Sequence, residues 1–283
     1  DVAEFKALGK VVDGRESVTT SYNVAKLHPE WCNTLRQPLQ WQPGMVEATK
    51  EERLREWGAQ VRLVTSANYD AAVSFFKAHI DETPFVSLDL ETTVPQESDE
   101  WLAGRKGVDV IASTIVGCGL TFGRNNQYGF YCSVDHKDTD NISREQLATL
   151  LELIPQDKMT IAHNAAGFEL PVLYQAFGER WKSNGWRGFL PNMVDSRLAA
   201  SYWDENQPSH GLKQLTKLLL GYEQTSYDEV TQGRKMNEMT AVETLSYGLD
   251  DVYTATGLWN FFSTIMQIEG TLDAFMRIEQ YPM

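Results

Sequence analysis

Acidic side chains recur at positions whose spacing could bring them into one site. Asp89 and Glu91 stand two residues apart at the end of the apolar run FVSLDLE. On a strand, such a pair shares one face, with the Cα atoms roughly 6.5–7 Å apart. Two carboxylates on a buried face repel each other unless a hard cation such as Mg²⁺ or Mn²⁺ lies between them. The pair indicates a metal site, although two solvated carboxylates at a strand end are the simpler interpretation.

Two further groups carry acidic residues. Glu169 lies in HNAAGFELPVL, just after a short strand pattern and near a helix start, where the helix dipole favours a carboxylate. Tyr247 and Asp251 stand four residues apart in YGLDD, which places both on one face of a predicted helix. Taken alone, each pattern also fits a structural role, as a helix-start carboxylate and as a hydrogen-bonded Tyr–Asp pair.

Strand and helix patterns that could position these residues begin at residue 61. Their mixture predicts an α/β domain with a central sheet over residues 61–283. Residues 1–60 show no catalytic pattern, and we expect an N-terminal extension of unknown role there, with one charged helical stretch at 50–57. The strand patterns cover 61–65, 85–91, 111–123, 127–134 and 159–163, and the helix patterns cover 68–80, 143–154, 171–177, 194–203, 212–220 and 240–262.

Composition restricts the possible functions. The 283 residues include 25 Lys and Arg against 39 Asp and Glu, and the net charge of −14 argues against a protein that holds DNA by bulk charge. An acidic site can still meet phosphates through divalent cations. No run of about eighteen apolar residues occurs, so we expect no membrane contact. The first residues show no secretory leader. Because the chain starts with Asp1 and not with Met, we expect a trimmed or internal fragment.

The order of the three groups resembles a known family. D-x-E on a strand, N-x-x-x-F-E at a strand-to-helix junction and Y-x-x-x-D on a late helix resemble the motifs of the DEDD 3′–5′ exonucleases, in the variant with Tyr in the last motif. The similarity extends to the proofreading domain of family A, polymerase I-like DNA polymerases, including those of phages, and covers roughly residues 61–283. The stretches that carry it are 61–93, 194–203, 209–221 and 277–283.

The resemblance implies an architecture and a setting. The expected fold is RNase H-like, with a mixed central sheet flanked by helices. The expected partners are the 3′ end of single-stranded DNA and a polymerase domain of the same parent protein, absent from this chain. The implied location is the cytoplasm of a bacterium or of a phage-infected cell.

The resemblance also implies a mechanism. Two divalent cations, Mg²⁺ or Mn²⁺, would hydrolyse the terminal phosphodiester of a single-stranded or frayed 3′ end and release nucleoside monophosphates. Asp89 would bridge both cations, with Glu91 and Asp251 completing the first site. Glu169 would support the second site. The Tyr247 hydroxyl would orient the attacking water, since a pKa near 10 makes it a poor base.

Four more residues are implied to bind substrate. The backbone of Thr92 would lie beside the terminal nucleotide, and Met236 falls near the place of an aromatic residue that contacts a base. Asn164 either contacts substrate or caps the following helix. Phe168 either touches substrate or packs beneath the site, with core packing favoured.

One position departs from the family pattern, because Glu169 stands where Asp is usual. The extra methylene moves the carboxylate, and a misplacement of ~1 Å can cost ~10²-fold in rate. Two alternatives stay open, the first because of Glu169 and the acidic net charge, and the second because the motifs cannot exclude it. One is a weak or silent exonuclease fold that serves a polymerase as a DNA-binding or structural module. The other is an RNase D-like RNA exonuclease, whose chemistry would be the same.

Overall fold

The computed structural model describes residues 10–12, 15–17, 61–82, 85–94, 109–123, 126–181, 190 and 192–280. The chain divides into two compact units. The larger includes the described residues from 61 to 196 and from 224 to 256. The predicted extension over residues 1–60 lies outside the described residues, apart from the antiparallel pair β1 (Lys10–Val12) and β2 (Arg15–Ser17).

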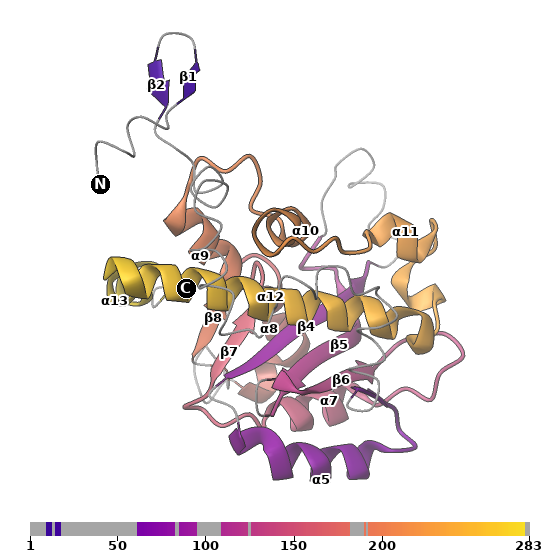
Figure 1. The fold of residues 1–283 in the computed structure, drawn as a ribbon. Helices are drawn as coiled ribbons and strands as arrows, with labels where there is room; N and C mark the ends of the chain where they lie inside the picture. The colour runs from indigo at the N-terminus through magenta and orange to yellow at the C-terminus, as the bar shows by residue number, and fades with distance from the viewer. Residues whose placement is uncertain are drawn as a thin grey trace. The chain divides into compact units, whose positions relative to one another are not determined.

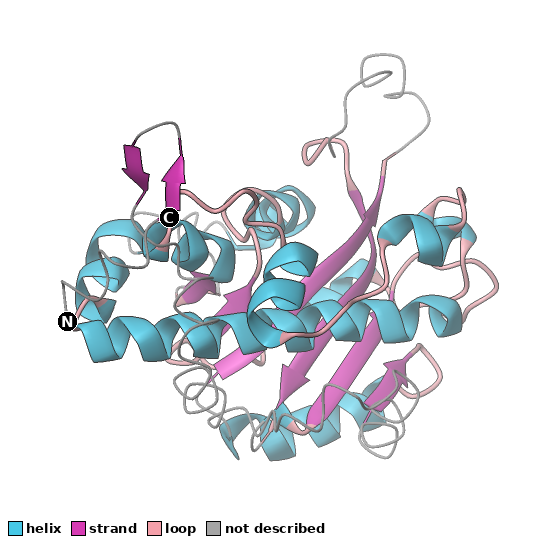
Figure 2. Ribbon diagram, turned by 45° about the horizontal axis from the view of Figure 1, so that its top comes forward, coloured by secondary structure: helices cyan, strands magenta, loops and turns pink. Residues whose placement is uncertain are grey.

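The larger unit contains a six-stranded mixed sheet in the order β3–β6–β5–β4–β7–β8 (Figures 1 and 2). Strand β5 pairs antiparallel with β4 and with β6, whereas the β3–β6, β4–β7 and β7–β8 pairs are parallel. This sheet confirms the predicted mixed α/β class. The strands are β3 (Val61–Val64), β4 (Phe85–Thr93), β5 (Thr114–Phe122), β6 (Tyr128–Ser133), β7 (Met159–Ala162) and β8 (Met193–Asp195).

The helices follow the apolar periodicity of the sequence in most places. Ser143 begins one of them as an N-cap, because its hydroxyl accepts a hydrogen bond from the Gln146 backbone N–H at 3.1 Å. The α-helices are α5 (Tyr69–His79), α7 (Arg144–Leu151), α8 (Glu169–Trp181), α9 (Ser196–Trp203), α10 (Leu212–Leu215), α11 (Tyr227–Thr231), α12 (Ala241–Glu269) and α13 (Leu272–Phe275). Shorter 3₁₀ or π segments are η3 (Ile80–Glu82), η7 (Thr216–Leu220), η8 (Met236–Glu238) and η9 (Met276–Gln280).

One predicted helix begins later than expected. The pattern over 194–203 predicted a helix from its first residue, but residues 193–195 form β8, which pairs parallel with β7. The sheet edge supplies hydrogen bonds that a local pattern cannot reveal. The sequence patterns also did not predict α11 or η8, since a single helical turn leaves almost no periodicity.

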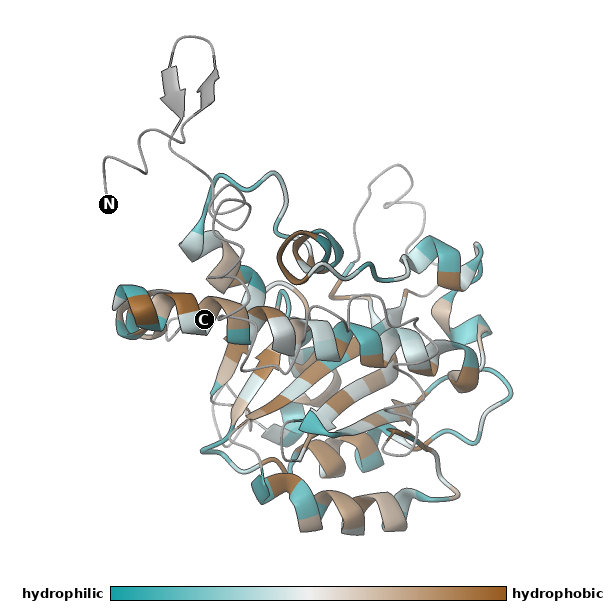
Figure 3. Cartoon of the chain, in the orientation of Figure 1, coloured by the Kyte–Doolittle hydropathy of each residue, from teal (hydrophilic) through white to brown (hydrophobic). Residues whose placement is uncertain are grey.

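Helices α5 and α12 cover opposite faces of the sheet. Phe76 of α5 packs its ring against Phe122 of β5, with centroids 4.6 Å apart. Gly119 points to the other face, toward Gly248 and Val252 of α12. The first part of α12 crosses the sheet in both views (Figures 1 and 2). Apolar residues, brown in Figure 3, lie along the strands and along this helix, so burial of both surfaces holds the layers together.

Two glycines let α12 approach the sheet closely. A Cβ at Gly119 would lie 2.6 Å from Val252 Cγ2 and 2.9 Å from the Gly248 carbonyl oxygen. A Cβ at Gly248 would lie 2.5 Å from the ring of Tyr131. These are closer than carbon atoms can pack. Glycine at both positions therefore sets the distance between α12 and the central strands.

A β-bulge lies directly beside Glu91. Glu91 pairs with Gly117, whereas Thr92 pairs with Ile115, so Val116 is an extra residue on β5. The Val116 side chain is fully buried and packs with Met236, Met239 and Tyr247. The bulge thus places a buried apolar side chain beneath the α12 tyrosine.

The smaller unit includes the described residues 197–223 and 257–280 and contains aromatic contacts of its own. Trp203 of α9 lies 5.5 Å from the rings of both Phe261 and Phe262. Tyr202 lies 5.3 Å from Phe275 of α13. Among the residues that the structure describes, no helix is long and apolar enough to cross a membrane.

We predict that Gly119→Ala lowers the free energy of unfolding by about 1–3 kcal/mol, because the added methyl forces α12 away from β5. Urea denaturation followed by circular dichroism measures this loss. Gly129→Ala in β6 is the matched control, because its Cβ would meet Leu249 and Val61 only at ordinary contact distances of 3.4–3.5 Å. Equal stability of the two variants would contradict the close-approach argument.

Candidate active site

Three carboxylates meet where β4 faces α12. Asp89 and Glu91 lie on β4, and Asp251 lies on α12. One ligand oxygen from each lies within 4.8 Å of the other two. A hydrogen bond between the buried hydroxyls of Ser87 and Thr256 ties the same strand and helix together. The structure therefore brings together the two motifs that are most distant along the chain.

The three carboxylates line a pocket of about 380 Å³. Six of the eleven lining residues come from the second half of β4 and the residue that follows it, one from the turn before α8, one from α11, one from the segment before η8 and two from α12. Both polar and aromatic side chains reach it. The lining residues are Asp89, Leu90, Glu91, Thr92, Thr93, Val94, Phe168, Tyr227, Lys235, Tyr247 and Asp251.

Tyr247 lies in this lining, one helical turn before Asp251, and is buried. Burial and the negative charges of Asp251 and Glu91 raise the pKa of its phenol above the ordinary 10.0. The hydroxyl therefore stays protonated at neutral pH. A protonated phenol beside carboxylates can donate a hydrogen bond and orient a water molecule, and it does not act as a base.

Glu169 begins α8 and is 1% exposed. Burial and the neighbouring charge of Asp89 raise the pKa of its carboxyl well above the ordinary value. It does not belong to the group within 4.8 Å, but it is near enough to interact with Asp89 electrostatically. No described residue donates a hydrogen bond to its buried Oε2 atom.

The donor set fits a hard divalent cation. Three carboxylates with oxygens within 4.8 Å of one another are costly to hold together in a half-buried site, and a cation offsets their repulsion. The buried Oε2 of Glu169 also needs a partner, such as a water of the hydration shell that Mg²⁺ retains. Asp89, Glu91 and Asp251 are therefore the residues that could hold a metal, with Glu169 beside them.

Asn164 forms the turn that leads into α8. Its backbone is left-handed, with φ 72°, a conformation that Asn tolerates better than most residues. Its carbonyl accepts hydrogen bonds from the backbone N–H groups of Gly167 and Phe168. The buried Asp195 carboxylate accepts the Asn164 N–H at 2.8 Å and the Ala166 N–H at 3.3 Å. Asn164 is thus placed as a turn residue and is absent from the pocket lining.

The other predicted substrate residues divide into two groups. Thr92 and the half-buried Phe168 line the pocket. Met236 is fully buried, packs in one cluster with Tyr247 and is absent from the pocket lining. The local turn geometry of η8 directs its side chain into the core.

Sequence reasoning missed three neighbours of the site. The Gln224 side chain donates to Asp251 Oδ1 at 2.5 Å and so fixes that carboxylate. Tyr227 is 44% exposed at the pocket, and Lys235 adds a positive charge to the lining. The segment SYDEV contains a capping box, formed by Ser226 and Glu229. This signal could have predicted the start of α11, which carries Tyr227.

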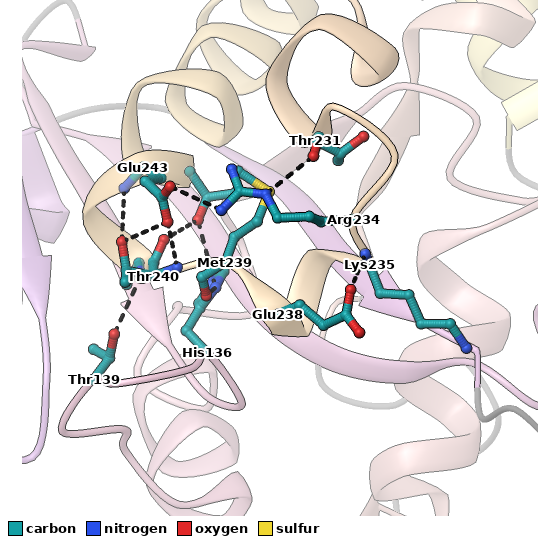
Figure 4. A network of polar contacts seen from close by, with 11 residues as sticks. His136, Thr139, Thr231, Arg234, Lys235, Glu238, Met239, Thr240 and Glu243 are labelled. Carbon is teal, nitrogen blue, oxygen red and sulfur yellow. Dashed lines mark hydrogen bonds and ion pairs between the residues drawn. The ribbon is translucent and has the colours of Figure 1, made fainter.

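A buried histidine connects the strands with the segment before α12 (Figure 4). His136 Nδ1 lies 3.1 Å from the Met239 carbonyl oxygen, which can only accept, so Nδ1 carries the proton. Nε2 then accepts a hydrogen bond from the Tyr131 hydroxyl at 2.8 Å. Burial lowers the pKa of His136, against weaker opposing effects of Met239, Asp135 and Glu243. The imidazole is therefore neutral at pH 7.

We predict that added Mn²⁺ raises the melting temperature of the protein and that Asp89→Asn removes most of this rise. At a hundredfold excess over Kd, one bound ion stabilises the fold by about 2.7 kcal/mol. Without metal, Asp89→Asn should be at least as stable as the unmodified chain, because a repelling charge is gone. Asp157→Asn, an exposed acidic residue elsewhere, is the control. A full Mn²⁺ response in Asp89→Asn would contradict the assignment.

We predict a pH dependence of stability that originates at His136. Because its folded pKa lies below the unfolded value near 6.5, the unfolded chain binds more protons under mildly acidic conditions. The histidine's contribution is complete above about pH 6.5 and is lost as pH falls through the folded pKa. Urea titrations at about pH 7.5 and 5.5 should show a smaller difference for His136→Gln than for the unmodified chain. Identical differences would refute this origin.

No protein-family model matches the sequence, and no curated protein matches it. Solved structures do match. The EXO domain of Nibbler from Aedes aegypti is similar with a TM-score of 0.52 and 12% identity, over 77% of this chain and 96% of that domain. NrnC of Brucella melitensis has a TM-score of 0.49 and 16% identity, over 76% of this chain and 86% of NrnC.

The RNase domain of yeast Pop2 has a TM-score of 0.46 and 13% identity, over 73% of this chain and 87% of that domain. At these identities the likeness shows the fold alone, and the Nibbler domain carries that argument. The mixed six-stranded sheet flanked by helices agrees with it. The chain therefore shares the fold of the Nibbler EXO domain, a mixed sheet flanked by helices, in agreement with the predicted architecture.

Proposed function

We propose that this chain is a metal-dependent 3′–5′ exonuclease that removes one nucleotide at a time from a single-stranded or frayed 3′ end. The observation that carries the proposal is the convergence of Asp89, Glu91 and Asp251 in one pocket, with Tyr247 at its lining and Glu169 beside it. Four acids from three separate elements, beside a protonated phenol, suit phosphodiester hydrolysis better than they suit a structural role.

The residues of the site divide the work. Asp89, Glu91 and Asp251 would hold the cations, two in our proposal, while Glu169 would support the second position. When bound, divalent cations lower the pKa of water and neutralise charge on the phosphate. The Tyr247 hydroxyl would donate to the attacking water and aim it at phosphorus.

The pocket suits one nucleotide. Its volume of about 380 Å³ is near the lower end of ligand sites, which span roughly 300–1,000 Å³. Phe168 and Tyr227 offer aromatic faces on which any base can stack without regard to sequence. A paired terminus would have to separate before entering, so a mismatched end, which frays at lower cost, would be preferred.

We propose DNA as the substrate and proofreading as the role, next to a polymerase domain of the same parent protein. The support is the resemblance of residues 61–93, 209–221 and 277–283 to polymerase I-like proteins. RNA hydrolysis would use the same carboxylates, so comparison of the two substrates belongs to the test.

We predict that a 5′-labelled single strand of DNA is shortened in single-nucleotide steps with Mg²⁺ or Mn²⁺. The reaction should stop in EDTA, and Asp89→Ala should reduce the rate by at least ~10²-fold, because a shared ligand is removed. Asp157→Ala is the matched control at an exposed position. A matched RNA strand is assayed in parallel, and faster RNA cleavage would favour the RNA exonuclease. Cleavage that persists in excess EDTA would exclude the proposed mechanism.

Glu169→Asp separates an active enzyme from a silent fold. If the unmodified chain binds DNA without cutting it, and the substitution restores cleavage, the extra methylene alone silences the site. If the unmodified chain cuts, Glu169 serves as it stands. Binding without cleavage in both proteins would replace our proposal with a structural, DNA-binding role.

A further inference from the structure

Lys235 is the one cation among the described residues that line the pocket. It precedes η8 and is half-buried, whereas the neighbouring Arg234 is exposed. Every other charged group in the described lining is a carboxylate, namely Asp89, Glu91 and Asp251. An ammonium group cannot bind a cation, so Lys235 has no role as a metal ligand. Its place in an otherwise acidic pocket therefore calls for another explanation.

The backbone of Lys235 is held on both sides. Its N–H donates to Glu238 Oε2 at 2.8 Å, and the next residue, Met236, is anchored in the core beside Tyr247. On the other side, Arg234 pairs with Glu243 of α12 at 3.0 Å. Figure 4 shows the Lys235 side chain extending away from this network. The segment is therefore built so that its ammonium group reaches outward from a fixed base.

The ammonium group reaches the far end of β4. Lys235 Nζ lies 3.5 Å from the carbonyl oxygen of Val94, a long hydrogen bond. Val94 lies three residues beyond Glu91, which corresponds to roughly 10 Å along a strand. The positive charge is therefore displaced from the carboxylates along the pocket. An ammonium group has three donors, so it can bind an anion while it keeps the carbonyl contact.

We propose that Lys235 binds the backbone phosphate directly 5′ of the one that is hydrolysed, an inference that rests on the proposed function. The scissile phosphate belongs at the carboxylates, and every other phosphate of the strand lies on its 5′ side. The nearest of these would lie along the end of β4, because the one cation of the described lining is there. Lys235 would thus set how far the strand enters, while Tyr227 stacks on a base.

The test measures binding without cleavage. Fluorescence anisotropy of a 5′-labelled DNA strand, in EDTA and at several salt concentrations, gives both Kd and its salt dependence. Lys235→Gln should weaken binding about tenfold at low salt. It should also reduce the slope of log K against log salt by about 0.7, the value of one phosphate contact on a single strand. Lys235→Arg should keep the slope.

Lys137→Gln is the matched control, because it makes the same substitution at an exposed lysine outside the pocket lining. Its slope should equal that of the unmodified chain. Equal slope losses in the two variants would show that only general surface charge matters and would overturn the proposal. Unchanged melting temperatures of both variants establish that they are folded.

A neutral methylphosphonate linkage locates the contact. Placed directly 5′ of the scissile position, it should weaken binding of the unmodified chain as much as Lys235→Gln does. The two changes together should cost no more than either alone. Additive losses would place Lys235 elsewhere. If the unmodified chain cuts DNA but none of these differences is found, the inference fails and the exonuclease proposal stands; if it neither binds nor cuts, both fail.

Discussion

The close contact between α12 and the central strands determines whether a site exists at all. Asp89 and Glu91 belong to the sheet, and Asp251 belongs to the helix, so their separation is the separation of two layers. That distance is set by Gly119 and Gly248, which present no side chain where the layers meet. A metal site here depends on residues that have no chemistry of their own.

The larger unit concentrates like charges and surrounds them with specific supports. Gln224 holds one oxygen of Asp251, and the buried Asp195 carboxylate holds the turn from which α8 begins. Burial and the charge of Asp89 raise the pKa of the Glu169 carboxyl, so the fold disfavours its ionised form. The site is therefore a place where local stability is lower than it could be, which is typical of catalytic centres.

Sequence patterns identified the elements whose periodicity is strong. The two-residue spacing of Asp89 and Glu91 and the four-residue spacing of Tyr247 and Asp251 predicted shared faces, and the structure places each pair so. Spacing could not tell whether those faces meet, because that depends on packing between layers. The resemblance to exonucleases supplied this step, whereas the mixture of strand and helix patterns alone predicted the α/β class.

Other features were beyond the reach of local patterns. Strand β8 exists because β7 offers it an edge, and Met236 points inward because η8 turns it toward Val116 and Tyr247. Lys235 is one of 25 basic residues, and nothing in its neighbourhood distinguishes it before the chain is folded. Asn164, which could have touched substrate or closed a turn, has the left-handed backbone that a turn requires.

The extra residue in β5 has a consequence for how this protein can change over time. Beyond Val116, the residues of β5 that face each side of the sheet are shifted by one position. A deletion of Val116 would restore regular pairing with β4 but would remove the side chain that packs beneath Tyr247. Such a shortened chain could keep its sheet and still misplace its phenol. A related protein with an insertion or a deletion at this point could therefore keep the fold and lose the activity.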